Sequence, residues 1–293
     1  MYEQIEENKR NTIILIALFA VIITALSWVL GEFVLGFGFG GLFFGGIFVI
    51  FYALISYFFS SNIVLAISGA REVKKEEYPY LFNIIDGLSI AAGIPKPKAY
   101  IINDTALNAF ATGRDPEHGI VVFTTGILQK LDRQELEGVV AHEMSHIKNY
   151  DIRLQTVITV LIGVTALLSD ILLRSMLWGK NDNRDSKIGI AMLIGGILLA
   201  ILTPIIAQVI RLAVSRQREY LADASAALMT RNPDGLASAL EKIGGDREVL
   251  EAANKATAHL YIDNPLKNRK GLMDGMFSTH PPIAERVARL RKM

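Results

Sequence analysis

The sequence contains no cysteine and only five histidines among its 293 residues. The missing cysteines exclude disulfide bonds, metal sites built from thiolates and catalysis by a cysteine nucleophile. The formal net charge is only +1, so we expect no nucleic-acid partner. Any metal site in this chain must therefore be built from histidine, aspartate and glutamate.

Charged residues are also missing from two long stretches near the N-terminus. Residues 11–31 and 33–70 contain no Asp, Glu, Lys or Arg, and both are rich in Ile, Leu, Phe and Val. Each stretch reaches the roughly 20 residues needed to cross a bilayer. The first lacks a small-residue cleavage site, so we interpret it as a retained membrane anchor and not as a signal peptide. Six glycines between residues 36 and 46 of the second stretch favour close packing between helices.

The distribution of polar and apolar residues divides the chain into four parts. We predict a transmembrane hairpin over residues 1–62 and a second hydrophobic hairpin, transmembrane or membrane-embedded, over residues 154–214. Residues 63–153 and 215–293 are more polar, and we expect them to form the two parts of one domain outside the membrane.

The second hydrophobic hairpin is compatible with two topologies. Asp170 and Arg174 interrupt its first stretch, residues 154–178, whereas residues 188–214 contain a charge-free run long enough to span. Four spans and two spans plus an embedded hairpin both fit, and we favour four.

The orientation follows from positive charges beside the first hairpin, whose tip carries only Glu32. These charges are Lys9, Arg10, Arg71, Lys74 and Lys75. Because cytoplasmic flanks are enriched in Lys and Arg, we predict a multi-pass protein of the cell (inner) membrane with its polar domain facing the cytoplasm.

Periodicity within the polar parts predicts a mixed helix and strand domain. A helix is expected from Asp132 to about Tyr150, where Asp132 and Glu135 fit a capping box. Short strands are expected near 99–102, 109–111 and 120–124, and further helices over 77–92, 216–230, 234–243 and 282–291. The fold class is therefore a mainly α membrane protein whose transmembrane helices accompany an α+β domain with a small sheet.

The motif H-E-x-x-H lies within the helix predicted to begin at Asp132. His142 and His146 are four residues apart, so they lie on one helix face and both imidazoles can bind one metal ion. Glu143 projects beside them and can accept a proton from a water activated by the metal. This pattern is typical of zinc proteases.

A catalytic zinc ion needs a third protein ligand and leaves one position open. Glu219 and Asp223 are again four residues apart on a predicted helix. We expect Glu219 to bind the metal and Asp223 to fix the ring of a ligand histidine, as outer carboxylates commonly do.

The chain resembles the HtpX heat-shock protease family, membrane zinc metalloproteases related to the CAAX prenyl proteases. The resemblance covers nearly the whole length and rests on the N-terminal hydrophobic hairpin and on four motifs. These motifs lie at residues 108–113, 142–151, 216–223 and 278–282.

The resemblance implies a zincin-like (gluzincin-like) catalytic domain in the cytoplasm that degrades misfolded or damaged membrane proteins. It implies one Zn²⁺ per chain held by His142, His146 and Glu219, with Glu143 as the general base. Expected partners are a protein or peptide substrate and the lipid bilayer. The sequence does not specify the oligomeric state.

Three further residues are candidate contacts to substrate or transition state. Asn108 begins a strand that, at a sheet edge, would pair with an extended peptide. By resemblance, His280 lies near the site and stabilises the oxyanion, and Arg286 orients the same region. His118 and His259 have no partner at ligand spacing, so we expect structural roles for them.

The non-enzymatic alternative is a membrane adaptor or chaperone-like protein with a structural zinc ion. A structural zinc site normally has four protein ligands, and Glu143 would have no catalytic role beside such a site. An intramembrane protease with Asp274 as ligand would need an apolar sequence around H-E-x-x-H, which is absent here. A CAAX prenyl protease resembles the chain in its motifs, but its seven-span chamber needs a longer chain.

Overall fold

The computed structural model describes residues 2–29, 32, 39–178, 190, 193–199, 201, 216–254, 256–266 and 281–293. Its helices are α1 (Tyr2–Val29), α2 (Gly40–Ile67), α3 (Pro79–Ala92), α4 (Thr125–Lys130), α5 (Arg133–Lys148), α6 (Asp151–Trp178), α8 (Arg216–Thr230), α9 (Pro233–Gly245) and α11 (Ile283–Leu290). The strands are β1 (Arg71–Glu72), β2 (Lys98–Ile102), β3 (Ala109–Thr112) and β4 (Ile120–Thr124), with short 3₁₀ turns η2 (Pro116–His118) and η4 (Ala258–Leu260).

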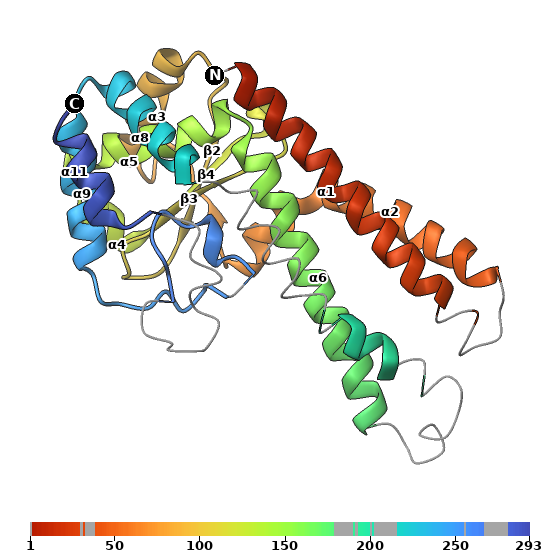
Figure 1. Cartoon of the computed structure of the whole chain (residues 1–293). Helices are drawn as coiled ribbons and strands as arrows, with labels where there is room; N and C mark the ends of the chain where they lie inside the picture. Colours follow the sequence, from red (N-terminus) through yellow and green to blue (C-terminus); the bar gives the residue numbers. More distant parts are fainter. Residues whose placement is uncertain are drawn as a thin grey trace.

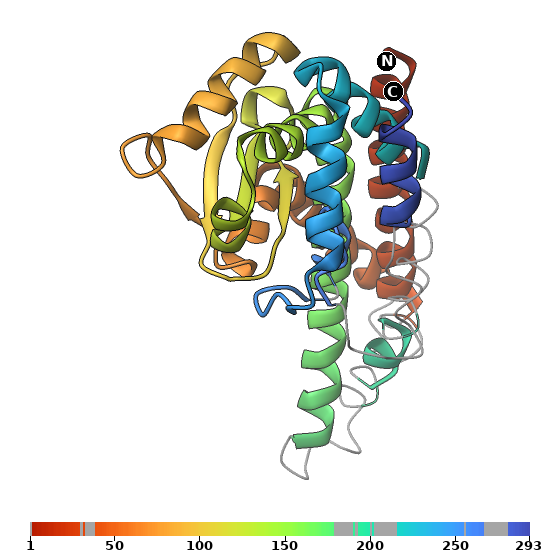
Figure 2. The same ribbon diagram turned by 90° about the vertical axis from the view of Figure 1, so that its left-hand side faces the viewer.

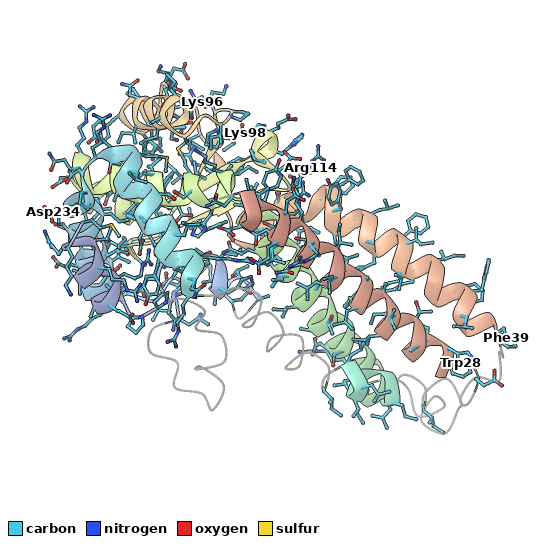
Figure 3. All side chains as sticks on the ribbon, turned by 45° about the horizontal axis from the view of Figure 1, so that its top comes forward. Trp28, Phe39, Lys96, Lys98, Arg114 and Asp234 are labelled. Carbon is cyan, nitrogen blue, oxygen red and sulfur yellow. The ribbon has the colours of Figure 1, made fainter. Side chains whose placement is uncertain are left out.

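Helices α1 and α2 form a hairpin that projects away from the part of the molecule that holds the sheet (Figure 1). Ile5–Ala25 in α1 and Gly40–Ile67 in α2 are long and apolar enough to cross a membrane. Figure 3 shows Trp28 and Phe39 at the far end of this hairpin, opposite the part that carries Lys96 and Asp234. The hairpin predicted from the two charge-free stretches is therefore present.

Small residues bring the two hairpin helices together. A Cβ atom added to Gly45 would lie 2.5 Å from Cβ of Ser27, which is closer than real Cβ atoms approach one another. The close packing predicted from the glycines is confirmed at Gly45, whereas Gly46 faces open space.

Helix α6 connects the polar domain with the hydrophobic region (Figure 2). Its 28 residues extend about 42 Å at 1.5 Å per residue. It packs against α1 and α2 through a cluster that includes Phe19, Tyr52 and Val160. Residues 193–199 return as a helix, and the Ser169 hydroxyl donates to the Gly196 carbonyl at 2.9 Å. Much of the stretch 188–214 lies outside the described residues, so the number of spans stays a prediction.

The sheet has the strand order β1-β2-β4-β3. Strands β2 and β4 are parallel, with Tyr100 opposite Val122, whereas β1 and β3 pair antiparallel with their neighbours. The sheet is therefore small and mixed, and β3 forms one of its edges.

Both faces of the sheet are buried, as successive side chains of β2 and β4 point to opposite sides. Ile101 and Phe123 belong to the core that includes α3 and α5. Ile102 and Val122 face a second core, which contains Val64 at the C-terminal end of α2 and residues near 250–261. The sheet thus joins the core that includes α3 and α5 to the base of the membrane hairpin.

The fold class is confirmed: the protein is mainly helical, with membrane helices and one small mixed sheet. The predicted strands lie within β2, β3 and β4, and four of the predicted helices correspond to α3, α8, α9 and α11. Helix α3 begins at Pro79 and not near 77, because the Glu77 carboxylate accepts hydrogen bonds from Arg71 and from the Lys74 amide in a preceding turn. Strand β1 and helix α4 were not predicted.

Candidate metal centre

Helix α5 positions the two histidines of the H-E-x-x-H motif. The capping box is present: the Asp132 carboxylate accepts from the Glu135 amide at 3.0 Å, and Glu135 accepts from the Asp132 amide at 2.8 Å. Lys242 on α9 adds a 2.6 Å ion pair to Glu135. These contacts fix the start of α5, nine residues before His142.

The third member of the centre comes from α8. The buried side chains of this helix recur with helical spacing, so one face of α8 packs towards the interior. They are Glu219, Ala222, Asp223, Ala226 and Ala227. The small alanines let α8 approach α5, and this approach brings the Glu219 carboxylate to the two histidines.

The donor atoms of His142, His146 and Glu219 converge at one buried point. The two Nε2 atoms are 3.2 Å apart, and each lies 3.6 Å from a Glu219 oxygen. All three potential ligand atoms lie within 4.8 Å of one another and could hold a metal ion. The spacing H-E-x-x-H and the separate acidic motif thus predict side chains that do meet.

The donor set and its spacing fit a zinc ion. Two nitrogens bound tetrahedrally to one zinc ion at about 2.0–2.1 Å are about 3.3 Å apart. The observed separation between Nε2 of His142 and Nε2 of His146 is 3.2 Å. Two imidazoles and one carboxylate also form a three-ligand set of the kind that leaves a position for water in catalytic zinc sites.

Asp223 and Arg286 surround His142. The Asp223 carboxylate lies 3.0 Å from Nδ1 of His142, which leaves Nε2 directed towards Glu219. Arg286 is fully buried and donates to both Asp223 oxygens, at 2.9 and 2.7 Å. Burial opposes ionisation of Asp223, but the Arg286 charge and the hydrogen bonds to His142 and Arg286 together outweigh it and lower the pKa of this carboxyl. The carboxylate therefore stays ionised and holds the histidine ring.

Asp151 contacts His146 in the way that Asp223 contacts His142. Asp151 was not predicted as a site residue. Its Oδ2 lies 3.0 Å from Nδ1 of His146. Helix α5 ends at Lys148, and Tyr150 takes a left-handed conformation with φ 61°, so the chain turns before Asp151 begins α6. The sequence signal was an aspartate five residues after His146, at the end of the resembling motif.

Protonation of His146 competes with metal binding. Burial lowers the pKa of its imidazole, but the hydrogen bond to Asp151 and the charge of Glu219 outweigh burial and raise it to about 9. A metal ion binding Nε2 must therefore displace a proton, as metal-ligating histidines are neutral.

Known proteins with a similar sequence identify the family. The sequence profile of peptidase family M48 matches residues 75–293, about three quarters of the chain. The chain belongs to peptidase family M48. "Protease HtpX homolog" proteins of Dictyoglomus thermophilum and Listeria monocytogenes serotype 4a are 51% and 44% identical to it. Both alignments cover 100% of this chain, and they cover 94% and 100% of the two relatives.

A solved structure supports the fold of this M48 peptidase. The crystal structure of S. mikatae Ste24p superposes with a TM-score of 0.50 at 19% sequence identity. The match covers 99% of this chain and 67% of that chain. The family, the HtpX relatives and the two apolar helices establish a membrane metalloprotease, whose substrates are proteins or peptides.

In this M48 peptidase Glu143 is buried beside the two histidines. Its side chain is 2% exposed, and burial raises the pKa of its carboxyl although both histidines oppose the shift. A carboxyl group with a raised pKa is better suited to accept a proton near neutral pH.

The remaining predicted residues lie in different places. Asn108 is buried, and its amide donates to the Asp263 carbonyl at 3.1 Å, which holds a neighbouring loop. His280 lies outside the described residues. His118 pairs with Asp115 at 2.6 Å, and His259 is buried with its Nε2 3.3 Å from the Gln155 carbonyl. Neither His118 nor His259 belongs to the metal cluster.

Proposed function

We propose that this M48 peptidase is a membrane-anchored zinc endopeptidase that hydrolyses peptide bonds in misfolded or damaged proteins, including membrane proteins. The convergence of His142, His146 and Glu219 next to buried Glu143 carries the proposal. One Zn²⁺ per chain would be held by the two imidazoles and the carboxylate.

Zinc supplies a Lewis acid that lowers the pKa of water to near 7 and polarises the scissile carbonyl. Glu143 would take the proton of the attacking water and pass it to the leaving amine. Asp223, held by Arg286, would keep His142 oriented and raise its basicity. The position of His280 near the developing oxyanion stays a prediction from the family resemblance.

We further propose that an extended substrate pairs with the edge strand β3. The Asn108 carbonyl accepts a hydrogen bond from the Thr124 amide. In an antiparallel pair every second residue bonds to the neighbouring strand, so the N–H and C=O groups of Ala109 and Ala111 point away from β4. The Ile262 amide already bonds to the Ala109 carbonyl. The substrate would therefore pair at Ala111, and backbone pairing would let the protease accept many sequences. A peptide with one N-methylated amide near the cleaved bond should then bind more weakly, and unchanged KM at every methylated position would contradict this pairing.

The multi-pass arrangement and the cytoplasmic orientation belong to the same proposal. The natural chain has no cysteine, so single-cysteine variants report topology without background. We expect a membrane-impermeant maleimide to label Glu32→Cys in intact cells and Glu76→Cys only after the cells are opened. The reverse pattern would contradict the orientation.

The experiment that tests the activity compares two glutamate variants on α5. The protein is purified in detergent without metal, zinc is added, and cleavage of unfolded casein is followed. Glu143→Gln should lower turnover by about 10²- to 10⁴-fold, the usual contribution of a general base, while keeping zinc. Glu137→Gln is the matched control, because Glu137 pairs with Arg133 on the exposed side of the same helix.

The outcomes separate the enzyme from the alternative. Equal cleavage by wild type and Glu143→Gln would contradict the role of Glu143. Zinc binding without cleavage of casein or of the protein itself, in wild type and both variants, would favour the structural zinc of an adaptor or chaperone-like protein.

A further inference from the structure

The first turns of α1, at the start of the helix that forms the first candidate membrane span, contact residues beside the metal centre. Asn8 is only 1% exposed, which is unusual for a polar side chain so close to the start of a membrane helix. Figure 1 shows this end of α1 beside the catalytic domain. A buried asparagine needs hydrogen-bond partners. One partner of Asn8 is the residue that contacts His146.

The side-chain amide of Asn8 contacts the Asp151 carboxylate, which in turn contacts His146. Its Nδ2 atom donates to Oδ1 of Asp151 at 2.6 Å, while Oδ2 of the same carboxylate lies 3.0 Å from Nδ1 of His146. Oδ1 of Asp151 thus contacts Asn8 and lies 3.7 Å from the Arg218 guanidinium, whereas Oδ2 contacts His146. The carboxylate could rotate away from His146 only by giving up the bond from Asn8.

Asn8 also fixes the turn that presents Asp151. Its Nδ2 donates a second hydrogen bond, at 2.8 Å, to the carbonyl of Asn149. The adjacent Lys9 places its ammonium 4.9 Å from the centre of the Tyr150 ring. Helix α1 therefore contacts residues 149 and 150, which join α5 to α6, and Asp151, the first residue of α6.

We propose that Asn8 is a positioning residue of the metal centre, which acts through Asp151 to orient the imidazole of His146. The inference rests on the proposed function, because it assumes that His146 is a zinc ligand. It follows that the N-terminal helix completes the metal site as well as anchoring the protein. Because α1 packs on the junction between α5 and α6, a movement of the membrane hairpin would then change the affinity of the site for zinc.

The test measures the zinc dissociation constant of the full-length protein in detergent, by competition with a chromogenic chelator. Asn8→Ala should weaken zinc binding by about 10-fold, the lower end of the effect seen for partners of ligand histidines. Asn8→Asp has the same shape but lacks the donor and adds a negative charge next to Asp151, so its loss should be at least as large. Asn11→Ala, a half-buried asparagine on the same helix, should stay within about twofold of wild type.

A double-mutant cycle distinguishes positioning from a general loss of packing. If Asn8 acts through Asp151, zinc binding by the pair Asn8→Ala/Asp151→Ala should be no weaker than by Asp151→Ala alone. Additive losses would overturn the inference, as would unchanged zinc affinity in both Asn8 variants. A wild-type protein that binds no zinc would instead overturn the proposed function, and the role of Asn8 with it.

Discussion

The catalytic domain and the membrane hairpin differ in where they place their large apolar side chains. The core around α5 is made of large apolar residues such as Phe123, Leu136 and Ile147. In α2 most large residues point outward, as Phe51 does with 63% exposure, while small residues such as Gly45 and Ser56 take half of the buried positions.

The difference reflects the surroundings of each region, which are water for the catalytic domain and lipid for the hairpin. In water, apolar burial stabilises a core, so large side chains gather inside. In lipid there is no such driving force between helices, and close backbone packing and hydrogen bonds take over. The metal centre lies where the two regions meet, since Asp151 begins α6 and contacts Asn8 of α1.

The largest loss of stability is expected when a buried charge is removed from the catalytic domain. Arg286→Met would leave the Asp223 carboxylate without its buried cation, and removing one partner of a buried ion pair costs about 3–5 kcal/mol. A denaturant titration in detergent measures this loss, and we expect zinc affinity to fall with it. Arg289→Met on the same helix is the control: its exposed pair with Glu285 should contribute about 1 kcal/mol or less. Equal effects of the two variants would argue against a structural role for the buried network.

Truncating one phenylalanine in each region tests the comparison directly. Phe123 is fully buried in β4, so Phe123→Ala should lower the free energy of unfolding by about 3–5 kcal/mol. Phe51→Ala removes the same ring from the lipid-facing side of α2 and should cost less than about 1 kcal/mol in a bilayer disc. A large loss in Phe51→Ala would show that this face of α2 packs against protein and not lipid.

The smallest effect concerns the contact between α1 and α2. Gly45→Ala places a methyl group against Ser27, and overpacking of this kind costs about 1–3 kcal/mol. Gly46→Ala meets open space, so its unfolding should match that of wild type. If both variants unfold alike, the helices of the hairpin do not pack as closely as described.

Local patterns were sufficient for most of the helices and strands and for most of the metal centre. The four-residue spacing of His142 and His146, the capping box at Asp132 and the acidic pair Glu219 and Asp223 each depend on one helix and can be recognised from neighbouring residues. Their convergence then required only that two helices pack face to face.

The supporting contacts could not be predicted in the same way. Asn8 and Asp151 are 143 residues apart, and no periodicity relates them. Asp151 could have been suspected from its place after His146, but the left-handed turn at Tyr150 that presents it gives no signal in a non-glycine residue. The division of residues 154–214 into spans depends on lipid contacts and stays a prediction.

The assignment of the three ligands is tested most directly by the zinc content of Glu219→Ala, measured by elemental mass spectrometry on protein purified with zinc and freed of excess metal. Wild type should retain one zinc ion per chain, and Glu219→Ala should lose it, as should His142→Ala and His146→Ala. Glu241→Ala, at an exposed position of α9, should keep the metal. Stoichiometric zinc in folded Glu219→Ala would contradict the ligand set on which the account rests.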